Sequence, residues 1–281
     1  VVQGPLVAQD NFTMTTLKLY RLNFPDASII FSTWAVSKTI VDELKKHAII
    51  VLQNKPPQIA GISNLNMQIV TSKAGIIYAE KNGAQFILKT RSDQRIYHPS
   101  LDLYLFSLLR AFPLKSKKLE QTNRLIGISL DSQKYRIYGL SDMFLFGCAS
   151  DMIKYWDATM DTRQGLDKII NIDAITNRGF SELCIGPVYL NTKFLEKIGH
   201  TCKWTLKDSF TVLKDRFIIV DQSAIKLLWH KYTINEDRYS QFGTFDPEIS
   251  FNDWLTLYSS INEINIDETI LDNKFVVNGT T

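Results

Sequence analysis

Short apolar runs and stretches of helical periodicity alternate along the amino-terminal third of the sequence. The runs are rich in β-branched and aromatic residues, which is typical of buried strands, and they occupy 1–6, 27–34, 47–52 and 86–88. Between them, apolar residues three or four positions apart predict helices over 13–23, 38–46 and 64–79. This order predicts right-handed crossovers and a mostly parallel central sheet with helices on both faces.

The chemistry of the chain changes abruptly after the fourth run. Residues 86–88 are followed by Lys89, Arg91, Asp93 and Arg95. Such a change is expected where a buried strand emerges at a site, so we expect Asp93 at the carboxyl end of a central strand. A carboxylate there can hold a divalent metal against a diphosphate while arginines contact the phosphate oxygens. The alternative is a strand that ends in surface ion pairs.

Two other predicted strands also end in polar or aromatic residues. Gln3 and Gly4 close the first, and Thr33 and Trp34 close the second. Because the carboxyl ends of parallel strands meet at one edge of a sheet, we expect these residues beside Asp93 in a nucleotide-type site. Trp34 would stack there on a base or sugar, and the alternative is a tryptophan of the core.

The predicted helix over 64–79 begins with two residues that favour helix caps, Asn64 and Asn66. A helix that starts beside the sheet edge offers its first N–H groups to phosphate. The alternative for both residues is an ordinary cap without a ligand.

Further along the chain the pattern favours helices but includes additional strands. Helical periodicity covers 101–112 and 223–232, and an apolar helix that opens at Ser141-Asp142 is expected to run through Trp156. Strands are expected at 125–129 and 135–138. The loop 240–247 carries Phe242 and Phe245 and is interpreted as a lid or an aromatic staple. We therefore expect a C-terminal, mainly helical lobe.

Composition narrows the class of protein. The 281 residues are 45% hydrophobic, which is enough for a large core, and the net charge of +3 argues against a nucleic-acid binder. Three cysteines without CxxC spacing and four scattered histidines favour a cytosolic protein with reduced thiols and give no support to a zinc hydrolase. There is no apolar run of about 20 residues, as a membrane span requires, and no visible signal peptide. A short leader ahead of Val1 stays open.

Five ordered blocks of the sequence resemble the WavE lipopolysaccharide-synthesis family. The resemblance covers roughly the first two-thirds of the chain. It implies a GT-A-like glycosyltransferase of bacterial surface polysaccharides, in which Asp93 matches the acid that binds the metal and diphosphate of a sugar nucleotide. Ser92-Asp93 is a reduced form of the Asp-x-Asp signature, and Met67 stands where an arginine is expected. The blocks are Val1–Pro5, Phe24–Trp34, Asn64–Gln68, Leu88–Asp93 and Ser141–Gly147.

The resemblance gives two carboxylates a catalytic interpretation. An inverting transfer needs a carboxylate that removes a proton from the acceptor hydroxyl as it attacks the anomeric carbon. Asp142 resembles a residue of the acceptor-sugar pocket, and Glu182 heads an apolar segment. Capping of a helix explains Asp142 equally well, and a first-turn helix position explains Glu182. The sequence leaves the stereochemistry open.

The sequence therefore predicts an α/β, GT-A-like fold with a catalytic domain over 1–190 and the helical lobe over 191–281. The expected partners are a nucleotide-sugar donor and a glycan or lipid-linked glycan acceptor, with Mn²⁺ or Mg²⁺ at Asp93. The basic cluster 115–118 permits peripheral contact with the inner face of the plasma membrane. Two alternatives are a non-catalytic glycan-binding or assembly subunit and a sugar-phosphate or nucleotidyl transferase. The donor-binding residues expected are Gln3, Gly4, Pro5, Thr33, Trp34, Asn64, Asn66, Gln68, Arg91, Asp93 and Arg95.

Overall fold

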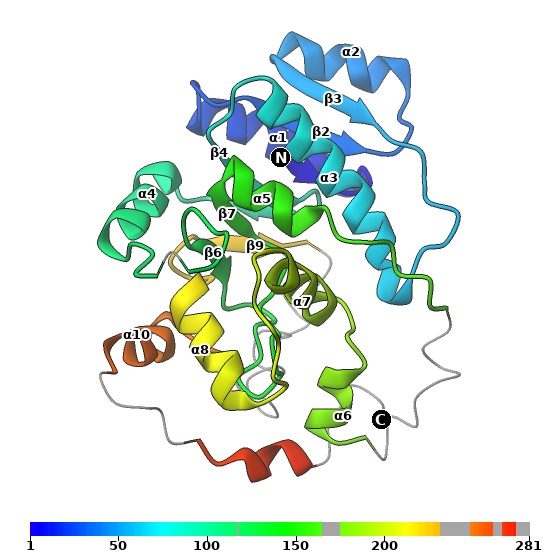
Figure 1. Ribbon diagram of the computed structural model, residues 1–281. Coiled ribbons are helices and arrows are strands. Elements are labelled where there is room, and N and C mark those ends of the chain that lie inside the picture. Colours follow the sequence, from blue (N-terminus) through cyan, green and yellow to red (C-terminus); the bar gives the residue numbers. More distant parts are fainter. Residues whose placement is uncertain (117, 165–174, 231–247, 261–265, 274–281) are drawn as a thin grey trace.

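The computed structural model describes residues 1–116, 118–164, 175–230, 248–260 and 266–273. A seven-stranded sheet runs through its centre, in the order β3-β2-β1-β4-β7-β6-β8 (Figure 1). Every strand of this sheet runs in the same direction except β7, which is antiparallel to both neighbours. The strands are β1 (Val2–Gln3), β2 (Ile29–Thr33), β3 (Ile49–Gln53), β4 (Phe86–Arg91), β6 (Leu125–Ile128), β7 (Leu145–Cys148) and β8 (Phe217–Val220). The expected GT-A-like α/β architecture with a mostly parallel sheet is confirmed.

Helices cover both faces of the sheet. In the described part of the chain, no helix is both long and apolar enough to cross a membrane. Two short strands, β5 (Gln94–Ile96) and β9 (Leu227–Trp229), form a separate antiparallel pair. The α-helices are α1 (Phe12–Asn23), α2 (Lys38–Lys46), α3 (Leu65–Lys81), α4 (Leu101–Ala111), α5 (Ala149–Trp156), α6 (Asn177–Glu182), α7 (Pro187–Lys197), α8 (Leu206–Arg216) and α10 (Phe251–Ser259). The 3₁₀ helices are η1 (Gln9–Asn11), η2 (Ile62–Asn64) and η5 (Glu268–Asp272).

The central strand β4 shows which helices share a face. The ring of Phe86 meets Phe106 of α4 at 5.0 Å between centroids, whereas the Lys89 amine lies 4.5 Å from the ring of Trp156 in α5. Because successive side chains of a strand point to opposite faces, α4 and α5 lie on opposite sides of the sheet. In Figure 1, α3 and α5 lie side by side in front of the strands, and these two helices contact each other.

Three predicted elements are wrong. The helix expected to open at Ser141-Asp142 begins only at Ala149, because residues 145–148 pair with β4 and β6 as strand β7. Residues 135–138 form turns, with Tyr138 in the left-handed region, and the buried pair Ile137 and Tyr138 packs from a loop without strand pairing. Residues 223–232 were expected to be helical, but the described part forms turns and then β9, which pairs with β5. The proposed lid over 240–247 lies outside the described residues. The domain boundary expected after residue 190 falls inside α7. Strand β8, which follows this boundary, pairs with β6 in the central sheet.

Gly4, which follows β1, lies against Ser92, which follows β4. The φ of Gly4 is +121°, a conformation that side chains rarely adopt, and a Cβ there would lie 2.6 Å from Ser92 Oγ. That hydroxyl donates to the Pro5 carbonyl at 2.7 Å, and the Gly4 N–H donates to the Ser32 carbonyl at 3.1 Å. Gly4 therefore allows the ends of β1, β2 and β4 to meet.

Replacing Gly4 with alanine should lower the free energy of unfolding by about 2–4 kcal/mol, because backbone strain and a steric clash add. Gly83→Ala is the matched control, since Gly83 also has a positive φ, +87°, but has nothing within 4 Å of the added Cβ. We expect that variant to lose only about 1 kcal/mol. Urea unfolding of both variants measures the difference, and equal losses would show that the contact with Ser92 is unimportant.

Candidate functional site

Polar residues gather at the carboxyl edge of the sheet. Because β1, β2, β4 and β6 all point toward this edge, the residues that follow them lie along one side of the molecule. Gln3 ends β1 and Thr33 ends β2, while Asp93 lies two residues beyond β4. Asp142 lies on the loop that enters β7, the antiparallel strand, and so reaches the same edge.

The carboxylate of Asp93 is held by two partners. Arg91 binds it through two hydrogen bonds, Nε to Oδ1 at 2.9 Å and Nη2 to Oδ2 at 3.0 Å. The indole Nε1 of Trp229 donates to Oδ2 at 3.0 Å. Burial alone would raise the pKa of Asp93, but these hydrogen bonds and the charge of Arg91 outweigh it and hold the pKa below its usual value. Asp93 is therefore ionised and fixed in position.

Lys89 places a second cation on the same face of β4. Its side chain is fully buried, and Nζ donates to the Asp142 carbonyl at 2.7 Å and lies 3.8 Å from Asp142 Oδ2. Burial lowers the pKa of Lys89 to about 8, although the charge of Asp142 opposes that shift. Within the described chain, Asp142 Oδ2 is buried without a hydrogen-bond partner. Lys89 thus orients the loop that carries the predicted catalytic carboxylate.

The donor groups around Asp93 do not fit a divalent metal as they stand. Both carboxylate oxygens are engaged by Arg91 and Trp229, whereas hard cations prefer several free oxygen ligands. Among the described residues there is also no group of three or more His, Cys, Asp or Glu side chains suited to a metal. We therefore derive no chemical step through a metal at this position.

The ends of β1 and β2 are tied to α3 by buried hydrogen bonds. Thr71 Oγ1 donates to Gln3 Oε1 at 3.3 Å, and Ser32 Oγ donates to the Thr71 carbonyl at 2.6 Å. Thr33 is fully buried, and its Oγ1 has no hydrogen-bond partner among the described residues. Trp34 is partly buried and Pro5 is exposed. Gln3, Gly4 and Thr33 are thus brought to one edge, as the sequence predicted for parallel strands.

Asn66, from the predicted donor-binding block 64–68, holds two loops together. Asn66 is buried, and its amide exchanges hydrogen bonds with both backbone groups of Asp161, at 2.7 Å each. Asp161 in turn binds Arg163, which also donates to the carbonyls of Leu183 and Cys184. Asn66 is thereby linked to the segment that follows Glu182.

The remaining predicted residues lie in varied environments. Asn64 is exposed and left-handed, with φ of 60°, and its side chain makes no capping bond to α3. Gln68 is partly buried, and its Oε1 has no hydrogen-bond partner in the described chain. Glu182 is the exposed last residue of α6, so it does not sit in a first turn. Arg95 binds α1, where Nε donates to Thr16 Oγ1 at 2.9 Å and the guanidinium lies 4.3 Å from the Phe12 ring.

Two residues that the sequence reasoning missed lie at this edge. Trp229 reaches Asp93 from β9, and no local pattern reveals a contact across 136 positions. Glu248 pairs with Gln133 in a β-bridge, and its Oε1 accepts a hydrogen bond from the Asp131 N–H at 2.6 Å. Burial, supported by the charge of Asp131, raises the pKa of Glu248 to about 7. Asp131 follows β6 and ion-pairs with Arg136 at 3.6 Å.

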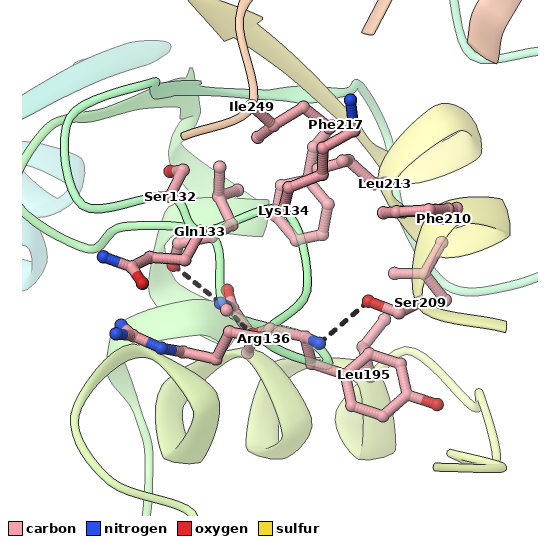
Figure 2. Close-up of a pocket in the computed structure, with 15 residues that line it drawn as sticks. Ser132, Gln133, Lys134, Arg136, Leu195, Ser209, Phe210, Leu213, Phe217 and Ile249 are labelled. Atoms are coloured by element: carbon pink, nitrogen blue, oxygen red, sulfur yellow. Dashed lines mark hydrogen bonds between the residues drawn. The ribbon is translucent and has the colours of Figure 1, made fainter. Parts of the chain in front are cut away.

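A small pocket beside the loop that follows β6 is too small for a substrate. Figure 2 shows it between the loop of Ser132–Arg136, Leu195 of α7 and Ser209 of α8, and the Ser209 hydroxyl accepts a hydrogen bond from the Tyr138 N–H at 2.9 Å. Its volume is about 30 Å³. A cavity of that size holds about one water molecule, whereas ligand pockets measure roughly 300–1,000 Å³.

Comparison with protein families gives a match over nearly the whole chain. Residues 1–275 match the family described as WavE lipopolysaccharide synthesis. The chain belongs to the WavE family. This membership gives the protein a role in lipopolysaccharide synthesis and extends the predicted resemblance from the first two-thirds to the C-terminal region. A search among curated proteins found no match.

The raised pKa of Glu248 in this WavE protein predicts a specific pH dependence of stability. The folded state keeps the Glu248 proton up to about pH 7, whereas an unfolded glutamate loses it near 4.5. The folded state therefore binds more protons between these values, and stability falls as the pH rises through this window. Glu248→Gln should remove that part of the decline. Melting temperatures of both proteins from pH 4.5 to 7.5 test this, and parallel curves would contradict it.

Proposed function

We propose that this chain is a glycosyltransferase that moves a sugar from a nucleotide-activated donor to a growing lipopolysaccharide or capsule glycan. The main observation behind the proposal is that Asp93 holds the Arg91 guanidinium in a fixed position at the carboxyl edge of the central sheet. That edge is where open α/β sheets bind nucleotide ligands. Membership of a lipopolysaccharide-synthesis family supports the same conclusion, because the sugars of such glycans are added from activated donors.

Arg91 has free capacity for a diphosphate. Its Nε and Nη2 are used by Asp93, but within the described residues Nη1 has no hydrogen-bond partner. The Trp229 ring lies 5.7 Å from the guanidinium carbon and restricts its movement. A fixed guanidinium of this kind donates hydrogen bonds from its remaining N–H groups to a leaving diphosphate without first having to reorganise. Asp93 acts in this proposal as the residue that positions Arg91.

Asp142 is the preferred acceptor base. Its backbone is fixed through Lys89, and its Oδ2 has no competing hydrogen bond in the described structure. A carboxylate in that state can accept the proton of an acceptor hydroxyl as the hydroxyl attacks the sugar. Glu182 is the second candidate, since it is exposed at the end of α6 and is linked through the following residues to Arg163.

A screen of nucleotide sugars, read as release of free nucleotide, tests the proposal. The donor that it identifies is then used to assay the variants. Arg91→Lys should lower kcat/KM about 10- to 100-fold, because lysine cannot reproduce the two-point contact with Asp93 and a third contact to phosphate. Arg21→Lys is the matched control. That guanidinium donates to the carbonyls of Pro25 and Ala27 near the amino end of β2, at the opposite edge of the sheet. Equal activity of the two variants would remove Arg91 from the site.

Thermal shifts with nucleoside diphosphates separate this proposal from a non-catalytic glycan-binding subunit. We expect a matching nucleoside diphosphate at 100 times its Kd to stabilise the protein by about 2.7 kcal/mol. We expect Mn²⁺ to add little, because Arg91 and Trp229 occupy the Asp93 oxygens. A large additional shift with Mn²⁺ would mean that Asp93 leaves Arg91 to bind metal. No shift with any nucleotide would favour the non-catalytic subunit.

A further inference from the structure

A concentration of positive charge lies outside the site described above, on the segment that joins α4 to β6. From Arg110 to Arg124 the sequence has five basic residues and one acidic residue, Glu120. Glu120 is paired with a lysine of α5 at 3.8 Å. Arg110, Lys115 and Lys118 are exposed, whereas Arg124 is only 1% exposed. The acid of this segment therefore does not neutralise its exposed cations.

Two buried arginines lie beneath the exposed cations. Arg124 donates to the Pro113 carbonyl at 3.3 Å and to a carbonyl at the end of α8, and Arg216 donates to the Ser116 carbonyl at 3.1 Å. Burial lowers the pKa of both arginines, and the nearby charge of Asp215 only partly opposes that shift. Two further positive charges therefore lie under the loop that carries the exposed lysines.

Helix capping accounts for part of this charge. The carboxyl ends of helices attract cations, and Arg124 binds carbonyls at the end of α8. The Lys115 amine lies 4.1 Å from the ring of Tyr258 in α10. Within the described chain, the side chains of Arg110 and Lys118 have neither a hydrogen-bond nor an ion-pair partner. Capping therefore leaves these two exposed cations unexplained.

An apolar stripe of α4 adjoins the cations. Leu103 is 67% exposed and Phe106 is 39% exposed, although both lie within the helix. Because residues three or four positions apart share one side of a helix, Leu103, Phe106 and Arg110 lie in one line along α4. In Figure 1, α4 and α10 lie on the same outer side of the molecule, well away from α2. The stripe and the cations form one surface, here named the α4 surface, which consists of Leu103, Phe106, Arg110, Lys115 and Lys118.

We propose that the α4 surface docks the protein on an anionic lipid bilayer, with Leu103 and Phe106 among the headgroups and the cations on the lipid phosphates. A helix that exposes apolar residues beside Lys and Arg is typical of such interfacial contacts, and anionic lipids attract each cation near the surface. Asp102, the one acid of α4, lies in the first turn, at the end away from the cations. A soluble polyanion would bind the cations but would leave the apolar stripe in water.

Self-association fits this surface poorly. Most homodimers are two-fold symmetric, so the same patch of one copy meets that patch of the other. Two copies of the α4 surface would bring Arg110, Lys115 and Lys118 toward their own counterparts, and like charges repel across an interface. An anionic bilayer supplies the opposite charge together with an apolar layer. Charge complementarity therefore selects the bilayer over a second copy of the chain.

Flotation of the full chain with lipid vesicles tests the proposal. Vesicles of phosphatidylglycerol and phosphatidylcholine in equal parts are compared with vesicles of phosphatidylcholine alone. We expect binding to the anionic vesicles only, and added salt should weaken it because salt screens exposed charges. The triple variant Arg110→Gln/Lys115→Gln/Lys118→Gln should bind about 100-fold more weakly, at roughly fivefold for each cation.

Two matched controls separate the α4 surface from charge and apolarity in general. Lys38→Gln/Lys45→Gln/Lys55→Gln removes the same charge from exposed lysines of α2 and of the loop after β3, and it should bind as the unchanged chain does, apart from the small effect of net charge. Leu103→Ser should weaken vesicle binding about fivefold. Leu22→Ser, in α1, is its control, because Leu22 is 77% exposed but lies outside the α4 surface. Melting temperatures verify that each variant is folded.

Several results would overturn the proposal. Absence of flotation, or equal binding by the two triple variants, would show that the α4 surface does not contact lipid. Unchanged vesicle binding by Leu103→Ser, with inorganic polyphosphate binding lost only in the Arg110→Gln/Lys115→Gln/Lys118→Gln variant, would identify a site for soluble polyanions. A dimer in sedimentation velocity that Leu103→Ser dissociates would identify a second copy as the partner. None of these outcomes depends on glycosyl transfer.

Discussion

Two cations on one face of the central strand govern the arrangement of this site. Lys89 and Arg91 are two positions apart in β4, so both point toward the side covered by α5. A buried charge is tolerated only when a partner compensates it. The loop that enters β7 therefore brings the Asp142 carbonyl and carboxylate to Lys89, and the turn after β4 returns Asp93 to Arg91. Charge compensation thus determines where both predicted carboxylates lie.

The same requirement changes the roles that the acids can have. Asp93 uses its oxygens to bind Arg91 and Trp229, so it fixes the guanidinium in position at the sheet edge. Asp142 has its backbone held by Lys89 and keeps one carboxylate oxygen without a hydrogen bond in the described chain. In the function that we propose, this division gives leaving-group stabilisation to Arg91 and proton transfer to Asp142.

The sequence predicts the sheet well because local signals dominate there. Apolar runs and helical spacing place β2, α2, β3 and α3 within a few residues, and Asp93 follows a central strand as expected. Contacts between distant segments have no such signal, so neither Trp229 above Asp93 nor Glu248 beside Asp131 could be predicted. A strand was wrongly predicted over 135–138, because a loop that packs on the core also requires apolar side chains. Lys89, which lies inside β4, was the one sign in the sequence of a buried ion pair.

The proposed reaction requires that the carboxyl edge beside Arg91 binds the diphosphate of the donor. Crystal structures of the protein with a panel of nucleoside diphosphates, compared with ligand-free crystals, test this most directly. We expect phosphate oxygens within hydrogen-bond distance of Arg91 Nη1, with the contacts between Arg91 and Asp93 retained. A diphosphate bound elsewhere, or an Asp93 side chain turned away from Arg91 to hold a metal ion, would contradict it.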